Sequence, residues 1–203
     1  MEWDALADTD TVAATMEALT ARGFNATYVD TAQEAVKRLL EMMPAGAKVH
    51  HKFSTTLIQM GFVKLLEETD RYDYWAKRIR GESDNERRLE LRRQAASSVD
   101  YLLGSVNAIA RTGEVVVAEA SGSGIAGYVY TARRVIWVAS AMKIVPTLED
   151  AVRRVRDHAL PRENQRVVDS GGAGSYIGKM AIFEREPSPG RISVVLVGER
   201  LGF

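Results

Sequence analysis

The sequence predicts an α/β fold of three layers, in which helices flank a mostly parallel sheet and a helical part stands at the N-terminus. Short segments rich in Val and Ile alternate along the chain with segments of helical periodicity, and this alternation is typical of βαβ units. The hydrophobic fraction is 46% of 203 residues, which is ordinary for a chain that buries a core. We expect a single domain over residues 1–203, with an N-terminal α/β part at 1–50 and a core at 51–203.

Residues 1–50 contain two helical segments, each followed by a short strand. In both helical segments the apolar residues fall on one side, behind a side chain that can cap a helix N-terminus. Gly23 and Pro44, residue types that end helices, follow the two segments. The expected elements are a helix capped by Asp10, a strand at 25–29, a helix from Thr31 and a strand at 47–50.

Residues 54–97 are predicted to be helical. The run Ser54-Thr55-Thr56 precedes apolar residues at helical spacing, so one hydroxyl can cap a helix that continues to about residue 66. Between residues 74 and 97, Arg, Lys and Glu dominate, and Gly81 interrupts the pattern. We expect two exposed helices there, with their charges paired along the surface.

Three apolar segments in the middle of the chain have the short, β-branched character of buried strands. Glycines separate them, including those of the loop Ser121-Gly122-Ser123-Gly124. We expect these segments to form the centre of the sheet: residues 99–103, 114–120 and 135–139.

The C-terminal third is expected to contain a helix, a mobile loop and a hairpin. Thr147 and Asp150 resemble a capping box, which predicts a helix from Thr147 to about His158. The loop Gly171–Ser175 has no apolar side chain to anchor it. The two last apolar segments, residues 179–183 and 192–197, are predicted to pair as a hairpin.

Composition excludes several classes of function. Lys and Arg together equal Asp and Glu at 27 each, so no global field attracts nucleic acid or an anionic membrane surface. Neither a signal peptide nor a membrane-spanning apolar run is present, and we expect a cytoplasmic protein with no membrane partner. The sequence is compatible with a homo-oligomer, but no motif in it indicates one.

We expect no cofactor and no metal. The chain has no cysteine, which excludes disulfides, thiolate nucleophiles and Cys-ligated iron–sulfur or zinc sites. His50, His51 and His158 do not have the spacing of a metal site. The glycines of residues 121–127 lack the order of a dinucleotide fingerprint, and no Walker lysine follows them.

Several short motifs resemble those of the LUD domain, the family of lactate utilization protein C. They are Asn107 to Ala110, Thr112-Gly113, Ile144 to Ala151, Pro189 to Val197 and Glu199 to Phe203. The resemblance covers roughly residues 54–203. It implies a fold similar to that of ribose-5-phosphate isomerase, glucosamine-6-phosphate deaminase and the CoA transferases.

In those enzymes a Ser/Thr turn after an early strand meets the substrate, and Ser54, Thr55 and Thr56 occupy the matching turn here. Backbone N–H groups at a helix start, joined by hydroxyls, suit a phosphate or carboxylate. The alternative is that these residues only cap the helix. His51-Lys52-Phe53 stand where the isomerases carry glycines, which limits close approach of the backbone to a phosphate.

A second candidate binding cluster flanks a buried strand, where open α/β sheets bind their ligands. Its members are Gly104, Asn107, Thr112 and Gly113. Asn107 could donate a hydrogen bond to a substrate oxygen. The alternative is turn chemistry, because Asn and Gly both permit unusual dihedral angles.

Three further residues are candidates by charge. Glu119 ends an apolar strand before a glycine loop and is the candidate general base or nucleophile, although a solvated strand-end carboxylate fits the same pattern. Lys143 and Lys179 can supply positive charge to an anion, whereas most lysines are surface groups.

The resemblance implies a protein of lactate or related organic-acid utilization. In that family the redox centres sit in partner proteins, so the chain would be an accessory subunit that binds a small anionic metabolite and works with iron–sulfur or flavin proteins. Two alternatives stay open. One is a stand-alone enzyme of the isomerase or CoA-transferase type, and the other is a binding module without catalysis.

Overall fold

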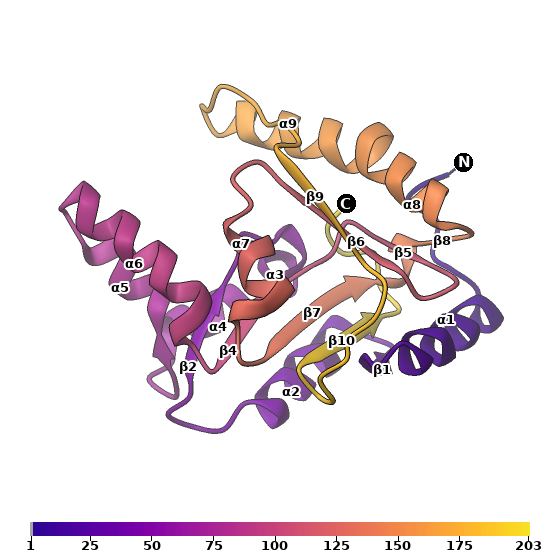
Figure 1. Ribbon diagram of the computed structural model, residues 1–203, viewed down its shortest axis with the longest axis horizontal. Coiled ribbons are helices and arrows are strands. Elements are labelled where there is room, and N and C mark those ends of the chain that lie inside the picture. The colour runs from indigo at the N-terminus through magenta and orange to yellow at the C-terminus, as the bar shows by residue number, and fades with distance from the viewer. Residues whose placement is uncertain (1) are drawn as a thin grey trace.

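The computed structural model describes residues 2–203 as two sheets with helices packed around them (Figure 1). The larger sheet has six strands in the order β1-β10-β7-β4-β2-β3, and every pairing in it is parallel. Its strands are β1 (Asn25–Val29), β2 (Lys48–His51), β3 (Asp73–Tyr74), β4 (Tyr101–Gly104), β7 (Val135–Ser140) and β10 (Ile192–Val197). The predicted α/β class with a mostly parallel sheet is therefore confirmed.

A smaller four-stranded sheet corrects two predictions. Its order is β8-β5-β6-β9, made of β5 (Ala108–Ala110), β6 (Val115–Glu119), β8 (Ile144–Val145) and β9 (Lys179–Phe183). The segment 114–120 thus lies outside the centre of the main sheet, and it pairs antiparallel with β5 and β9.

The predicted hairpin of β9 and β10 is also wrong, because the two strands enter different sheets. All residues of β10 are buried, which suits a strand between β1 and β7, whereas β9 is mostly half-buried or exposed. A strand whose residues are all buried is covered on both faces of its sheet, whereas a partly exposed strand has one face open to solvent.

The N-terminal helices begin at polar caps. Asp8 caps α1 (Thr9–Ala21) by accepting a hydrogen bond from the Thr11 N–H at 2.7 Å, so Asp10 is the wrong cap by two residues. Thr31 opens α2 (Ala32–Met42) with a complete capping box. The single helix predicted to follow Ser54 is broken at Gly61, whose φ is +76°.

That break separates α3 (Thr55–Gln59) from α4 (Phe62–Glu68), and the next two helices follow the prediction as α5 (Trp75–Gly81) and α6 (Asn85–Ser98). A short α7 (Ser123–Ala126) leads into a π-helical turn, η1 (Gly127–Thr131), and a 3₁₀ turn, η2 (Ala141–Lys143), follows β7.

The helix after Thr147 runs past its predicted end at His158. It consists of α8 (Leu148–Arg154), a π-helical turn η3 (Val155–Ala159) and α9 (Leu160–Asp169). Pro161 lies in the first turn of α9, where its missing N–H breaks the regular hydrogen-bond pattern. The widened π turn directly before it lets the chain continue as a helix.

The core has two main parts, one on each face of the larger sheet. Alternate residues of β7 show this division: Trp137 packs with α1, α6 and the smaller sheet, whereas Ile136 packs with α2, α3 and α4. No helix among residues 2–203 combines the length and apolar character needed to cross a bilayer.

Candidate functional site

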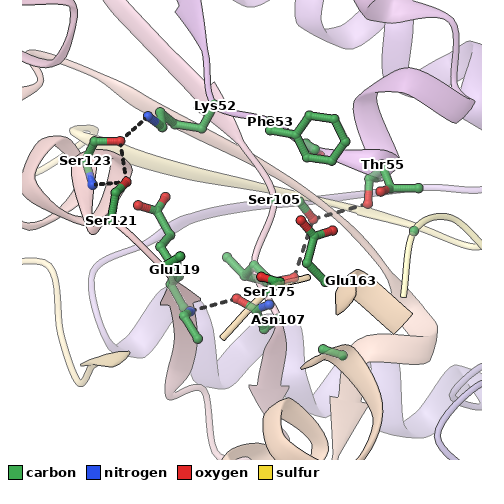
Figure 2. Close-up of a pocket in the computed structure, with 18 of the residues that line it drawn as sticks. Lys52, Phe53, Thr55, Ser105, Asn107, Glu119, Ser121, Ser123, Glu163 and Ser175 are labelled. Carbon is green, nitrogen blue, oxygen red and sulfur yellow. Dashed lines mark hydrogen bonds between the residues drawn. The ribbon is translucent and has the colours of Figure 1, made fainter. Parts of the chain in front are cut away.

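A cavity of about 470 Å³ opens at the carboxyl ends of β2, β4 and β7 (Figure 2). Lys52 and Ser105 directly follow β2 and β4, and Lys143 ends the 3₁₀ turn after β7. Glu119 enters from the end of β6, and Glu163 lines the cavity from α9. Open parallel sheets bind their ligands at this edge, so the cavity is the candidate functional site.

Lys143 is a buried cation in the wall of this cavity, with 3% of its surface exposed. Its ammonium donates to Ser105 Oγ and to the Val106 carbonyl oxygen, both at 3.0 Å, and to Thr56 Oγ1 at 3.4 Å. All three acceptors are neutral, and no carboxylate of residues 2–203 forms an ion pair with this ammonium.

Burial, followed by the nearby charge of Arg154, lowers the pKa of Lys143 from 10.5 to about 7. A buried charge without a partner is costly, so Lys143 in the free protein is only partly protonated near pH 7. An anion that entered the cavity would supply the missing partner.

The Ser54-Thr55-Thr56 turn serves two purposes. Ser54 caps α3, because its hydroxyl accepts from the Leu57 N–H at 3.2 Å. Thr56 is 1% exposed, and its hydroxyl lies 3.3 Å from Ser105 Oγ beside the Lys143 ammonium. The Thr55 hydroxyl is buried without a hydrogen-bond partner and also lines the cavity. The Ser54 hydroxyl therefore caps the helix, whereas the Thr55 and Thr56 hydroxyls take no part in capping.

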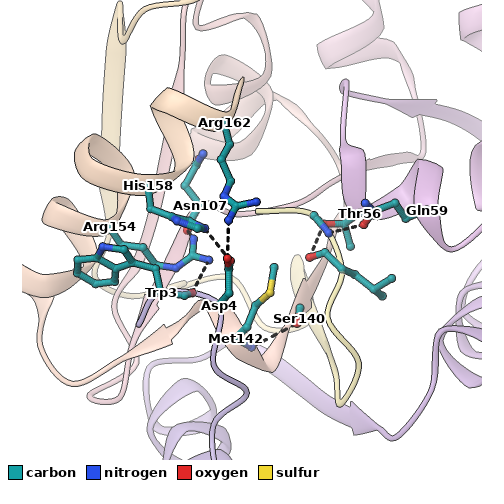
Figure 3. A network of polar contacts seen from close by, with 12 residues as sticks. Trp3, Asp4, Thr56, Gln59, Asn107, Ser140, Met142, Arg154, His158 and Arg162 are labelled. Atoms are coloured by element: carbon teal, nitrogen blue, oxygen red, sulfur yellow. Dashed lines mark hydrogen bonds and ion pairs between the residues drawn. The ribbon is translucent and has the colours of Figure 1, made fainter. Parts of the chain in front are cut away.

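Asn107 lines the same cavity with a fixed orientation. Its side-chain oxygen accepts from the Ala118 N–H at 2.8 Å, which leaves the amide NH₂ as the free donor. The buried guanidinium of Arg154 donates to the Asn107 carbonyl oxygen and, at 3.2 Å, to that of Trp3 (Figure 3). Arg154 thereby ties the loop after β4 to α8 and to the N-terminal segment.

Glu119 lies near the other end of the cavity. Its carboxylate accepts from the N–H groups of Gly124 at 2.8 Å and Ile125 at 3.3 Å, at the start of α7. Lys52 donates to Ser123 Oγ at 2.6 Å on the same side (Figure 2). A role for Glu119 as base or nucleophile stays a prediction.

Three predicted binding residues do not line the cavity. Thr112 and Gly113 form the turn between β5 and β6, where Gly113 has a φ of +93° and a Cβ would lie 2.8 Å from Ala18 of α1. Turn chemistry and close packing explain both residues. Gly104 lies behind the cavity wall, where a Cβ would be 1.9 Å from the hydroxyl of Tyr128.

The other candidates from sequence lie as follows. The Lys179 side chain packs over Gly122 at the edge of the smaller sheet. In the Gly171–Ser175 loop, Ser175 reaches the cavity and its N–H donates to the Asn164 side chain at 2.8 Å. No group of three or more His, Asp or Glu side chains within residues 2–203 is arranged to hold a metal ion.

Sequence reasoning missed Ser105 and Gly202 as site residues. Ser105 directly follows β4 and could have been found as a hydroxyl at a strand end. Gly202 carries no such signal: its N–H donates to Gln59 Oε1 at 2.6 Å, and a Cβ on it would lie 2.4 Å from Thr56 Oγ1. The C-terminal tail therefore closes one side of the site.

Fold and cavity together define an α/β protein with a largely parallel sheet and a pocket of mixed polar and apolar lining at its strand ends. The family model described as the LUD domain matches residues 12–197, and the chain belongs to the LUD domain family. This match includes most of the N-terminal part, which the motif resemblance over residues 54–203 had not covered.

A solved structure supports the same fold. The crystal structure of a DUF162 family protein from Deinococcus radiodurans is similar to this chain with a TM-score of 0.59 at 15% identity. The similarity covers 95% of this chain and 99% of that one. No curated protein matches the sequence.

Proposed function

We propose that this protein binds a small organic anion in the cavity and acts in the utilization of lactate or a related organic acid. The family association supports the metabolic role. The chain contains no cysteine to ligate an iron–sulfur cluster, so the proposal assigns electron transfer to separate iron–sulfur or flavin proteins. Deletion of the gene should impair growth on lactate, and unchanged lactate oxidation in the deletion strain would contradict this role.

The observation that carries the binding proposal is the uncompensated charge of Lys143. Its ammonium donates to the Thr56 and Ser105 hydroxyls and to the Val106 carbonyl oxygen, so it supplies positive charge behind two hydroxyls that can turn their own protons toward a ligand. The amide NH₂ of Asn107 is a further donor in the same cavity. Donors that gather around a cation without an ion-paired carboxylate favour a carboxylate or phosphate as ligand, and the Glu163 carboxylate that also lines the cavity is paired with Arg166. Charge-assisted hydrogen bonds of this kind contribute about 1.5–3 kcal/mol each.

Anion affinity should fall as the pH rises through about 7, the pKa of Lys143 in the free protein. Only the protonated lysine attracts an anion, and a carboxylate ligand keeps its charge throughout pH 6–9. Linkage therefore predicts that the association constant falls by up to about tenfold per pH unit between the pKa of Lys143 in the free protein and its higher pKa in the complex. Calorimetric titration with one carboxylate at pH 6, 7, 8 and 9 measures this loss.

The same titrations should show proton uptake on binding above pH 7, because the bound anion raises the pKa of the lysine. Buffers with different ionisation enthalpies reveal this uptake. An affinity that is constant from pH 6 to 9 would mean that Lys143 is not the binding cation.

A further inference from the structure

The cavity is larger than a three-carbon acid requires. At roughly 30 Å³ for each molecule of liquid water, a volume of about 470 Å³ corresponds to about 15 waters. Lactate has only about six non-hydrogen atoms, and cavities of this size enclose much larger ligands. A ligand held by Lys143 alone would leave most of the cavity to water.

A second cationic region lies across the cavity from Lys143. Lys52 follows β2, and β4 separates β2 from β7, the strand that leads to Lys143. Neighbouring strands are about 4.8 Å apart, so the two lysine-bearing turns start on the order of 10 Å from each other. In Figure 2, Lys52 and Ser123 lie on one side of the pocket, and Ser105 and Thr55 lie on the other.

The region around Lys52 carries a surplus of positive charge. Arg92 also lines the cavity there and forms no ion pair with a carboxylate of residues 2–203, whereas Arg80 is paired with Glu67. Glu119 is the carboxylate on this side, and two backbone N–H groups stabilise its charge, so Lys52 and Arg92 together exceed it by one positive charge.

The lowered pKa values of two neighbouring histidines are consistent with this surplus of positive charge. Burial, followed by the charges of Lys52 and other cations, lowers the pKa of His50 to about 3. Burial and the charges of Arg80 and Lys52 lower the pKa of His51 to about 4, against an opposing effect of Glu67. Both rings are therefore neutral at physiological pH and add no charge of their own.

We propose that the ligand is an elongated organic acid with two anionic groups, one at Lys143, Thr56 and Ser105 and the other at Lys52, Arg92 and Ser123. This inference rests on the proposed anion site at Lys143. It assigns the ligand to the dicarboxylic acids, whose carbon chain would contact apolar side chains that also line the cavity, among them Val106 and Val117.

Calorimetric titration of the full chain with propionate, lactate, succinate, glutarate and adipate tests the proposal. At least one dicarboxylate should bind about tenfold tighter than propionate, because it gains a second charge-assisted interaction. Lys52→Met should reduce the ratio of dicarboxylate to propionate affinity to about one. Glu119→Gln should increase that ratio, since it removes the opposing negative charge.

Lys48→Met is the matched control, because this exposed lysine lies at the opposite end of β2 and should leave the ratio unchanged. A merely structural role of Lys52 would lower both affinities together and keep the ratio. Dicarboxylates that bind no tighter than propionate, with propionate still dependent on Lys143, would overturn this inference and leave the proposed function standing. If no acid binds, the proposed function itself fails.

Discussion

Lys143→Met is expected to abolish anion binding and to raise the unfolding temperature of the free protein. Methionine has a similar length, and it removes an ammonium that the fold buries among neutral acceptors. Replacing a buried ion pair by apolar side chains of similar volume is often stabilising by about 1–4 kcal/mol, and removing a buried ammonium that has no ion-pair partner should act in the same direction. For a chain of this size, each 1 kcal/mol shifts the unfolding temperature by roughly 2–4 °C.

The gain in stability should depend on pH. The pKa of Lys143 is about 7 in the folded protein against 10.5 as its ordinary value, so the unfolded chain binds more protons between these pH values. The free energy of unfolding of the wild type therefore rises with pH between about 7 and 10.5, as far as Lys143 determines it. Below pH 7 the destabilising effect of the buried charge is fully present. The advantage of the variant should be larger at pH 6 than at pH 9.

Thermal unfolding of both proteins at the two pH values measures this difference, with Lys48→Met as a control that should change neither result. A lower unfolding temperature for Lys143→Met would show that the lysine stabilises the fold. It would contradict the view that this buried charge lowers the stability of the protein and serves ligand binding.

Gly104→Ala is expected to destabilise the fold next to the site. A Cβ at this position would lie 1.9 Å from the hydroxyl and 3.0 Å from Cζ of Tyr128. Tyr128 is 1% exposed and packs edge-on against Trp137, with ring centroids 5.5 Å apart, so a shift of the ring would disturb this buried contact. Overpacking of this kind costs about 1–3 kcal/mol.

Tyr128→Phe provides the test of this explanation, because it removes the hydroxyl with which the new methyl group collides. The double variant should recover at least half of the stability that Gly104→Ala loses, as measured by urea unfolding. Additive effects in this double-mutant cycle would place the cause of the loss elsewhere.

Local signals in the sequence predicted the elements that depend on local structure. The strand at 25–29 and the capped helix after Thr31 are confirmed, because polarity, capping and periodicity fix them within a few residues. The errors lie in pairing. No local feature shows that residues 114–120 join a second sheet, or that residues 179–183 and 192–197 separate into different sheets.

The same distinction applies to the candidate site. Thr56, Asn107 and Lys143 line the cavity because the parallel strands of the larger sheet end at a common edge and the residues after them meet there. Glu119 reaches the same cavity from the end of β6 in the smaller sheet. Gly202 reaches the site only through the path of the C-terminal tail to α3, which composition and spacing do not reveal.

The most direct test of the central claim is an NMR titration of the Lys143 side chain in the protein labelled with ¹³C and ¹⁵N, with and without a bound dicarboxylate. We predict a pKa of about 7 in the free protein and a rise of at least about one unit when the ligand is present. A pKa that stays near its ordinary value of 10.5, or one that the ligand does not move, would contradict the account of Lys143 as the anion-binding cation.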